Sequence, residues 1–423
     1  MKFSQLGQLA LASAVSGVLV LGITACGQSN TVDFLYVASA NLNPGQIYAF
    51  SVDGESGVLK QILGSPFPAG RNPIALVTAP NEKAVYALNH DDNTVIQYAV
   101  GSDGKLFSQN TYNIKSGTNP NGMALSPDGK TLYVVEAYGL DASGNPFSPT
   151  TPGIGALVQF PVNADATLGT ETAYPTCNNP VAVNVLANGS AVYVVNDPSG
   201  QLTTLIDTVA AQNRGATGSA TVTYPAAGAC FGGANAPGQI TSYVVGSDNT
   251  LTPGAGSPFA PGAAAPNAIA SDPKASAVYV TDFATSQMYS FAVQSNGGLQ
   301  ILTNPQPTGQ SPSAVTIDPS GKFIYVANYG GNTISGFGID QITGAPSVLA
   351  GTSNVGSADS GPASVLVEDA LGRYVYTANF IAGTVSSLFL DLNAGTPHTG
   401  QSSPFPGVSK ATAVASVKHN RTV

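Results

Sequence analysis

The chain has 423 residues, of which 48 are Gly and 30 are Pro, and residues that favour helices are scarce. This composition favours many short strands joined by tight turns over long helices. Charged residues make up 9% of the chain, and the formal net charge is −9 without any run of Lys or Arg. A nucleic-acid-binding surface is therefore not expected.

The first 25 residues have the pattern of an export signal. Lys2 precedes an apolar stretch from Leu9 to Ile23, which is too short for a comfortable membrane span. The segment that ends at Cys26, Ile-Thr-Ala-Cys, resembles a bacterial lipobox, and a polar linker over residues 26–31 follows. We therefore predict lipidation at Cys26. The alternative is an ordinary secretory signal in which Cys26 is incidental.

The predicted location is the bacterial cell envelope, outside the cytoplasm, with the membrane as a partner through the lipid anchor. Because Gly27 rather than Asp follows the lipidated residue, we expect the outer membrane if the host has one. Two further cysteines, Cys177 and Cys230, would lie in an oxidising compartment, so we predict a disulfide between them. The alternative is two buried free thiols. No pair of His residues lies near them in the sequence, so a zinc site is not expected.

A strand centred on Tyr recurs seven times, and most copies are about 50 residues apart. The repeated residues are Tyr36, Tyr86, Tyr133, Tyr193, Tyr279, Tyr325 and Tyr376. A short apolar strand precedes most copies, with a turn between the two such as Ser-Pro-Asp-Gly-Lys at 126–130. An alternating strand and a weaker outer strand follow, the latter starting near Leu59, Leu106, Leu168, Leu251, Leu299 and Val348.

This repeat predicts an all-β fold, a seven-bladed β-propeller with four-stranded blades in one domain over 32–423. The absence of Trp excludes propellers whose blades are docked by a repeated Trp. The first Tyr strand lacks an inner strand before it, and the apolar segment 411–417 is a spare one, so we expect the C-terminal strand to complete the first blade. Insertions are predicted near 140–153 and 207–237. Two segments, 201–206 and 239–245, compete as the third strand of the fourth blade.

The segment Tyr-Val-Ala-Asn at 325–328, with Asn-Thr-Ile-Ser at 332–335, resembles the YVTN repeat. Close copies begin at Tyr86 and Tyr376. The chain thus resembles the lactonase-like, YVTN-repeat seven-bladed propeller family over nearly all of its mature length. That family includes phosphogluconolactonase, the fungal carboxymuconate cyclase and many envelope propellers without known activity. The resemblance implies the fold and leaves the function open.

Three residues are catalytic candidates at the mouth of the central channel. His90, with Asp91 or Asp92 beside it, has the chemistry of a general base for water that attacks a lactone. Arg71 is placed to hold a carboxylate or a developing oxyanion, and Glu136 could share the proton transfer. The alternative is that His90 is a solvated turn residue. The enzymes that the chain resembles use more than one Arg on anionic substrates, whereas Arg71 alone is well placed here.

Other polar residues just after the Tyr strands are candidate ligand-binding residues: Asn89, Asp91, Asp92, Asn196, Asp282, Asn328, Tyr329 and Asn379. We predict no metal and no cofactor. The alternative, a channel-bound calcium ion on Glu136, Asn196, Asp282 and Asn328, is weakened because tight turns themselves require Asn and Asp.

Two functions are expected from these observations. The first is a monomeric binding or scaffold protein of the envelope, which takes a small molecule, a glycan or a protein at the channel mouth. The second is a lactone hydrolase at the same place.

Overall fold

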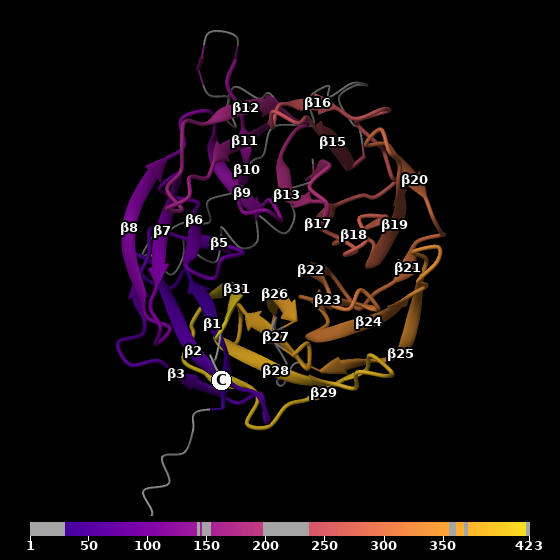
Figure 1. The fold of residues 1–423 in the computed structure, drawn as a ribbon. Helices are drawn as coiled ribbons and strands as arrows, with labels where there is room; N and C mark the ends of the chain where they lie inside the picture. Colours follow the sequence, from indigo (N-terminus) through magenta and orange to yellow (C-terminus); the bar gives the residue numbers. More distant parts are fainter. Residues whose placement is uncertain are drawn as a thin grey trace, which may run out of the picture. The chain divides into compact units, whose positions relative to one another are not determined.

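A computed structural model describes residues 30–141, 144–145, 154–197, 237–354, 361–367 and 371–419. Every regular element in these ranges is a β-strand, and the strands form seven antiparallel sheets. From Thr31 onwards the sheets are arranged as blades of a ring (Figure 1). The predicted all-β, seven-bladed propeller is therefore confirmed.

The first three blades follow each other along the chain. Blade 1 consists of β31 (Ala411–Lys418), β1 (Thr31–Ser39), β2 (Gln46–Asp53) and β3 (Leu59–Gln61), with β4 (Phe67–Pro68) also on β2. Blade 2 consists of β5 (Pro73–Thr78), β6 (Ala84–Asn89), β7 (Thr94–Val100) and β8 (Leu106–Asn113). Blade 3 consists of β9 (Thr118–Leu125), β10 (Thr131–Tyr138), β11 (Ala156–Pro161) and β12 (Thr172–Pro175).

The other four blades repeat this order. Blade 4 consists of β13 (Pro180–Val185), β14 (Ala191–Asn196), β15 (Gln239–Val245) and β16 (Leu251–Pro253). Blade 5 consists of β17 (Pro266–Ser271), β18 (Ala277–Asp282), β19 (Gln287–Val293) and β20 (Leu299–Ile301), with β21 (Gln306–Pro307). Blade 6 consists of β22 (Pro312–Ile317), β23 (Phe323–Asn328), β24 (Thr333–Ile339) and β25 (Pro346–Asn354). Blade 7 consists of β26 (Pro362–Val367), β27 (Tyr374–Asn379), β28 (Thr384–Leu390) and β29 (Pro397–Thr399), with β30 (Phe405–Pro406).

Blade 1 joins the two ends of the chain. The strand β31 pairs antiparallel with β1, with Phe34 opposite Val417 and Tyr36 opposite Ala415. The innermost strands contact one another in a closed series, which runs β31, β5, β9, β13, β17, β22, β26 and back to β31. The predicted closure by the C-terminal strand is confirmed, and it leaves no open edge between the first and last blades.

In six of the seven blades the hydroxyl of the repeated Tyr binds a backbone carbonyl of the next blade. Tyr36 Oη donates a hydrogen bond to the carbonyl of Gly104 at 2.9 Å, and Tyr376 Oη donates to the carbonyl of Gly57 at 3.0 Å across the closing seam. Both acceptors are buried turn residues between the third and fourth strands of the neighbouring blade. Desolvation raises the pKa of these phenols, to about 12 for Tyr193, so they remain donors. This bond explains why Tyr rather than Phe recurs.

A Ser-Pro-Phe motif recurs at 65–67, 257–259 and 403–405 and has a local role in three blades. The hydroxyl of Ser65 accepts the backbone N–H of Ala49 at 2.8 Å, where the outer strand has left the ladder. Ser257 and Ser403 do the same for Ser242 and Ser387. The hydroxyl therefore accepts a hydrogen bond from a backbone amide that has no partner in the short outer strand.

The structure resolves two ambiguous boundaries. The third strand of blade 4 is Gln239–Val245, whereas 201–206 lies outside the described residues, as do the predicted insertion at 207–237 and most of that at 140–153. The outer strand of blade 3 begins at Thr172 rather than near Leu168, which forms only an isolated bridge with Val162. The tight turn Asn163–Thr167 lies between the two residues of this bridge, and the outer strand begins only after it.

Candidate active site at the seam of blades 2 and 3

Two faces of the ring differ in the loops that they carry. The mouth face carries the loops from second to third strands and the loops that connect blades. The turn face carries the turns from first to second strands and from third to fourth strands. The candidate residues Arg71, His90 and Glu136 all lie at the mouth-face ends of their strands, where the sequence predicted them.

His90 and Asp91 form an imidazole–carboxylate pair in the turn that follows β6. Nδ1 of His90 lies 3.0 Å from Oδ1 of Asp91, and the two side chains are 10% and 19% exposed. The backbone fixes this turn, because His90 N–H donates to Asn72 O at 3.0 Å. Asn72 Nδ2 also donates to Asp91 Oδ1 at 3.1 Å. An ionised carboxylate can only accept, so Nδ1 carries the hydrogen and Nε2 the basic lone pair.

Arg71 is bound to the same turn rather than projecting freely into the mouth. Its Nε lies 2.5 Å from Oδ1 of Asp92, its Nη2 donates to the carbonyl of Asp91 at 2.8 Å, and its backbone N–H donates to Asp92 Oδ2 at 2.6 Å. The side chain is 46% exposed. The guanidinium thus holds the turn, and Asp92 already neutralises its charge.

Glu136, near the end of β10, is fully buried. Neither carboxyl oxygen has a hydrogen-bond partner among the described residues. Burial, reinforced by the charge of Glu171, raises the pKa of Glu136 well above its usual range. Gly117 makes room for the side chain, because a Cβ there would lie 2.7 Å from the Cβ of Glu136. Burial therefore favours the protonated form of the Glu136 carboxyl.

Glu136 lies on the side of blade 3 that packs against blade 2, and His90 lies in the turn that follows β6 of blade 2. Tyr86 and Leu88 of β6 pack with Leu132 and Val134 of β10 in a single apolar cluster between blades 2 and 3. Side chains alternate along a strand, so Glu136 lies on the same side of β10 as Leu132 and Val134, whereas His90 follows the last residue of β6 and belongs to a turn. No hydrogen bond between described residues joins Glu136 to His90 or Arg71. The structure thus joins His90 to Arg71 through one turn and sets Glu136 on the facing blade.

Most of the predicted ligand-binding residues occupy one position of the repeat, the third residue after the repeated Tyr, and they bind neighbouring loops. Asn89 Oδ1 accepts the N–H of Gly70 at 3.0 Å, and Asp282 Oδ2 accepts that of Ala264 at 2.7 Å. Asn196 Nδ2 donates to the carbonyl of Cys177 at 2.8 Å. Asn328 and Asn379 bind the hydroxyls of Ser335 and Ser386. All five are buried. Glu136 holds the same position in blade 3 without such bonds, which sets it apart.

An arc of aromatic residues on blades 5 to 7 was not recognised from the sequence, apart from Tyr329. Phe283, Tyr329 and Phe380 each come directly after the second strand, at the position that His90 holds in blade 2. The rings of Phe283 and Tyr329 are 6.4 Å apart, and Lys410 Nζ lies 5.0 Å from the centre of the Phe380 ring. The equivalence becomes visible once the seven copies are aligned on Tyr. At this position of the repeat, blades 5 to 7 therefore carry aromatic residues and blade 2 carries His90.

The structure describes the other predicted sites only in part. Cys177 is disulfide-bonded, while Cys230 and the lipidation candidate Cys26 lie outside the described residues. Within the described ranges, no three His, Cys, Asp or Glu side chains are grouped as metal ligands would be. The same part of the chain contains no helix of the length and hydropathy needed to cross a bilayer.

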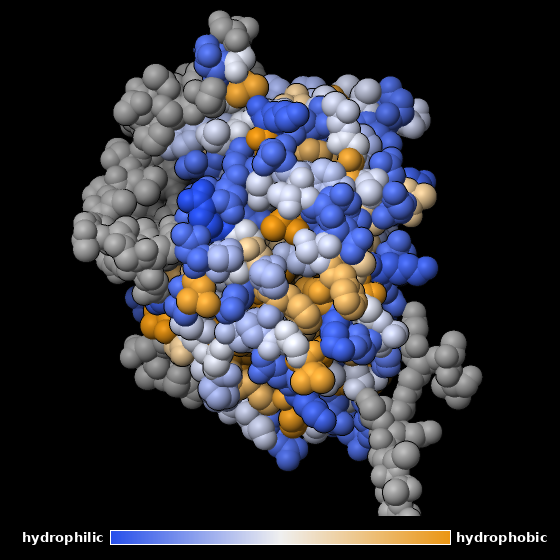
Figure 2. Space-filling model, turned by 90° about the vertical axis from the view of Figure 1, so that its left-hand side faces the viewer, coloured by the Kyte–Doolittle hydropathy of each residue, from blue (hydrophilic) through white to orange (hydrophobic). Residues whose placement is uncertain are grey.

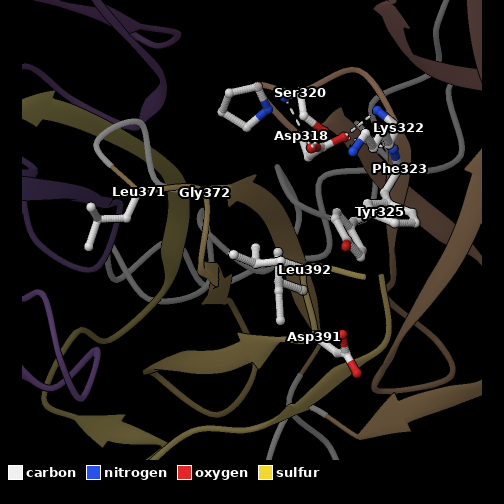
Figure 3. Close-up of a pocket in the computed structure, with 11 residues that line it drawn as sticks. Asp318, Ser320, Lys322, Phe323, Tyr325, Leu371, Gly372, Asp391 and Leu392 are labelled. Carbon is white, nitrogen blue, oxygen red and sulfur yellow. Dashed lines mark hydrogen bonds between the residues drawn. The ribbon is translucent and has the colours of Figure 1, made fainter. Parts of the chain in front are cut away.

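Three surface pockets formed by described residues lie on the turn face, away from the catalytic candidates. A pocket of about 430 Å³ lies between blades 6 and 7, where the turn Asp318–Lys322 faces Leu371, Leu390 and Leu392 (Figure 3). Equivalent pockets of about 610 Å³ and about 320 Å³ occur between blades 3 and 4 and between blades 2 and 3. They arise from the repeat itself and contain none of the catalytic candidates.

We expect the buried carboxyl of Glu136 to make the protein less stable as the pH rises. The folded protein keeps the Glu136 proton at pH values where the unfolded chain, with a pKa near 4.5, has released it. The free energy of unfolding should therefore fall from that pH upward until the raised pKa is reached. Glu136→Gln removes this component, so urea unfolding at about pH 5 and about pH 8 should show a smaller difference in the variant. An equal pH dependence in both proteins would show that Glu136 is not the group responsible.

The comparisons with known proteins agree with this architecture. Residues 233–358 match the family model described as Lactonase, 7-bladed beta-propeller. The periplasmic gluconolactonase of Pseudomonas aeruginosa superposes with a TM-score of 0.68 at 17% identity, covering 92% of this chain and 99% of that one. A proposed 6-phosphogluconolactonase from Bacteroides fragilis gives a TM-score of 0.67 at 17% identity, covering 92% and 99%. A functionally unknown protein from Desulfotomaculum acetoxidans gives 0.63 at 11% identity, covering 90% and 98%.

No match was found among curated proteins. The seven-bladed ring and the match over 233–358 together confirm the resemblance to the lactonase-like propellers. At these identities the solved structures establish the fold, and the fold is shared by proteins with and without a known activity.

Proposed function

We propose that this lactonase-like propeller hydrolyses small uncharged lactones at the seam of blades 2 and 3. The observation that carries the proposal is the His90–Asp91 pair at 3.0 Å on blade 2, with the buried carboxyl of Glu136, whose pKa is raised, on the adjacent blade 3. A base and an acid are what the hydrolysis of a cyclic ester requires. The gluconolactonase among the structural neighbours supports the same class of reaction.

The reaction balances with these two residues. His90 Nε2, which is buried in the structure, takes a proton from a water molecule that enters with the substrate, and the oxygen of this water attacks the lactone carbonyl carbon and forms a new C–O bond. Asp91 stabilises the imidazolium that results. The ring C–O bond then breaks, and the leaving alkoxide takes the proton of Glu136. The proton on His90 returns to the Glu136 carboxylate through solvent, so that one lactone and one water give one hydroxy acid.

The charges around His90 favour an uncharged substrate. Arg71 contributes one positive charge, while Asp91 and Asp92 contribute two negative ones in the same turn. Because Arg71 already binds Asp92 at 2.5 Å, a phosphate or carboxylate of a substrate would have to displace an existing ion pair. We therefore expect aldonolactones and aliphatic lactones to be better substrates than their phosphorylated forms.

The test is lactone hydrolysis by the purified protein across a panel of sugar and aliphatic lactones, with and without a phosphate group. His90→Ala should lower kcat/KM by about a hundredfold or more, since a positioned base typically contributes that much. His398→Ala is the matched control, because His398 is exposed on β29 of blade 7. Hydrolysis unaffected by His90→Ala, or absent with every lactone, would rule out this site as the catalyst.

A second candidate function is binding without catalysis, and one observation favours it. The two unpartnered oxygens of Glu136 would serve equally well to bind the hydroxyl groups of a glycan or another neutral small molecule. In that case the lactone assay is negative, and Glu136→Gln weakens ligand binding measured by calorimetry. A role as an envelope scaffold for a protein partner belongs to the same candidate.

We further propose that the protein acts outside the cytoplasm as a lipoprotein of the bacterial envelope, in the outer membrane if the host has one. The apolar stretch before Cys26, the disulfide-bonded state of Cys177 and the periplasmic neighbour support this location. Mass spectrometry of the mature N-terminus tests it. A diacylated Cys26 is expected, and an unmodified Cys26 would contradict the lipoprotein assignment.

A further inference from the structure

Among the described residues, the exposed large aliphatic side chains of the turn face are confined to blades 6 and 7. Ile342 is 95% exposed, Leu392 is 49% exposed and Leu371 is 41% exposed. Leu371 and Leu392 also line the pocket between these blades, opposite Lys322 (Figure 3). We call these three residues the aliphatic tips. By contrast, the outer side of blade 2 shows a mixed surface with scattered hydrophobic residues (Figure 2).

The internal repeat shows that the turns themselves do not require these residues. Leu371 lies three residues before the second strand of its blade. The equivalent residues of the preceding blades are all polar: Asn81, Asp128, Asn188, Lys274 and Ser320. Neighbouring exposed apolar side chains, such as Leu371 and Leu392 around one pocket, mark a surface that contacts a protein or a membrane.

The other two tips also replace small or polar residues. In blades 1, 6 and 7 the turn after the third strand begins with an Asp whose Oδ1 accepts the N–H two residues later, at Glu55, Ile342 and Asn393. At the middle position of this turn Ile342 therefore stands where the other two blades have Glu and Asn. Leu392 stands where blades 1 and 6 have Gly54 and Gln341.

The chain enters the ring at this same face. Thr31, the first residue of β1, pairs with Asp53, which begins a turn of the turn face. That turn contacts blade 7, since Tyr374 Oη donates to the carbonyl of Glu55 at 2.6 Å. Cys26 precedes Thr31 by five positions in the sequence, which is a reach of about 17 Å when fully extended. A lipid on Cys26 would thus hold this face, next to the aliphatic tips, close to the bilayer.

We propose that the turn face of blades 6 and 7 rests on a lipid bilayer, with Ile342, Leu371 and Leu392 inserted among the headgroups. The mouth face, with His90, then points away from the membrane toward soluble ligands. Lys322 and Arg373, both exposed, flank the tips at the level of lipid phosphates. Because the chain is acidic overall, contact depends on the apolar tips rather than on charge, and salt should change it little. This proposal does not depend on the lactonase activity.

The absence of Trp from the chain allows a direct test. Single-Trp variants of the full chain, Leu371→Trp and Leu392→Trp, are bound to phosphatidylcholine vesicles that contain brominated lipid. We expect a blue shift and quenching of both. Ile301→Trp is the matched control, since Ile301 is 63% exposed on the outer strand β20, and it should show neither effect.

A second set of variants separates specific contact from tethering. Leu371→Ser and Leu392→Gln introduce residues that other blades carry at these positions, so the turns should fold unchanged. Placed together in an Ile342→Trp background, they should reduce the quenching of the introduced indole severalfold. If the protein carries no lipid, the same variants are mixed with vesicles without a tether. The same comparison of quenching then tests whether the tips contact the bilayer. Three outcomes would overturn the proposal. They are equal quenching at positions 301 and 392, no quenching at any position, and shielding of these indoles by dimers that form as the protein concentration rises.

Discussion

A chain that ends at residue 410 is expected to lose the closed ring and with it most of its stability. The strand β31 supplies the innermost strand of blade 1, pairs with β1 from Asp33 to Ser39, and buries Val414 and Val417. Its loss exposes the edge of β1 and the flank of β5, which β31 contacts. We expect the thermal midpoint to fall by about 10 °C or more, as for a loss of several kcal/mol, with aggregation through the open edge.

The matched control is a chain that ends at His419, which keeps the whole of β31. It should unfold at the same temperature as the full chain, measured by circular dichroism and calorimetry. A chain that ends at residue 410 and melts at the same temperature as this control would mean that blade 1 folds with three strands. The closure would then contribute little to stability.

The second large loss of stability is expected from Gly57→Ala. Gly57 lies in the turn of blade 1 whose carbonyl accepts the hydrogen bond from Tyr376 of blade 7. Gly57 has φ +66°, and a Cβ on it would overlap the ring of Tyr374 from blade 7. The substitution thus adds a clash between the last and first blades to the strain of a left-handed residue, and it displaces the carbonyl that accepts the bond from Tyr376. We expect a loss of about 3–5 kcal/mol in the free energy of unfolding, measured with urea.

Gly189→Ala provides the comparison for this change. Gly189 has φ +72°, but nothing lies within 4 Å of the position that a Cβ would take. It should therefore show only the backbone strain, about 1–2 kcal/mol. If the two variants lose equal stability, the contact between blades 7 and 1 has relaxed around the new methyl group.

The fold could be predicted from the sequence because each blade carries its own signal. Seven Tyr strands, the turns before them and an unpaired apolar segment at the C-terminus define both the number of blades and the closure. The choice between 201–206 and 239–245 could not be made, because both segments alternate like strands and pairing with Ala191–Asn196 is a tertiary property. The role of the Tyr hydroxyl as a hydrogen-bond donor was missed for the same reason, because its acceptor lies in another blade.

The candidate site was predicted less completely. The sequence identified His90 and Arg71. It could not show that Asp91 pairs with His90 and Asp92 with Arg71, because this pairing depends on the geometry of the turn. The polar residues after the Tyr strands looked alike in sequence. Only their hydrogen bonds separate Asn89 and Asp282, which hold loops, from Glu136, which holds none among the described residues.

The closure of blade 1 also sets the order of events in biosynthesis. Three strands of this blade come from the beginning of the chain and the fourth from its end, so the ring cannot close until residue 418 has been made. Until then β1 lacks its inner neighbour, and the growing chain cannot complete its final form. Such a chain stays incompletely folded for as long as it is being synthesised. This property suits passage through a secretion channel that accepts only unfolded polypeptides.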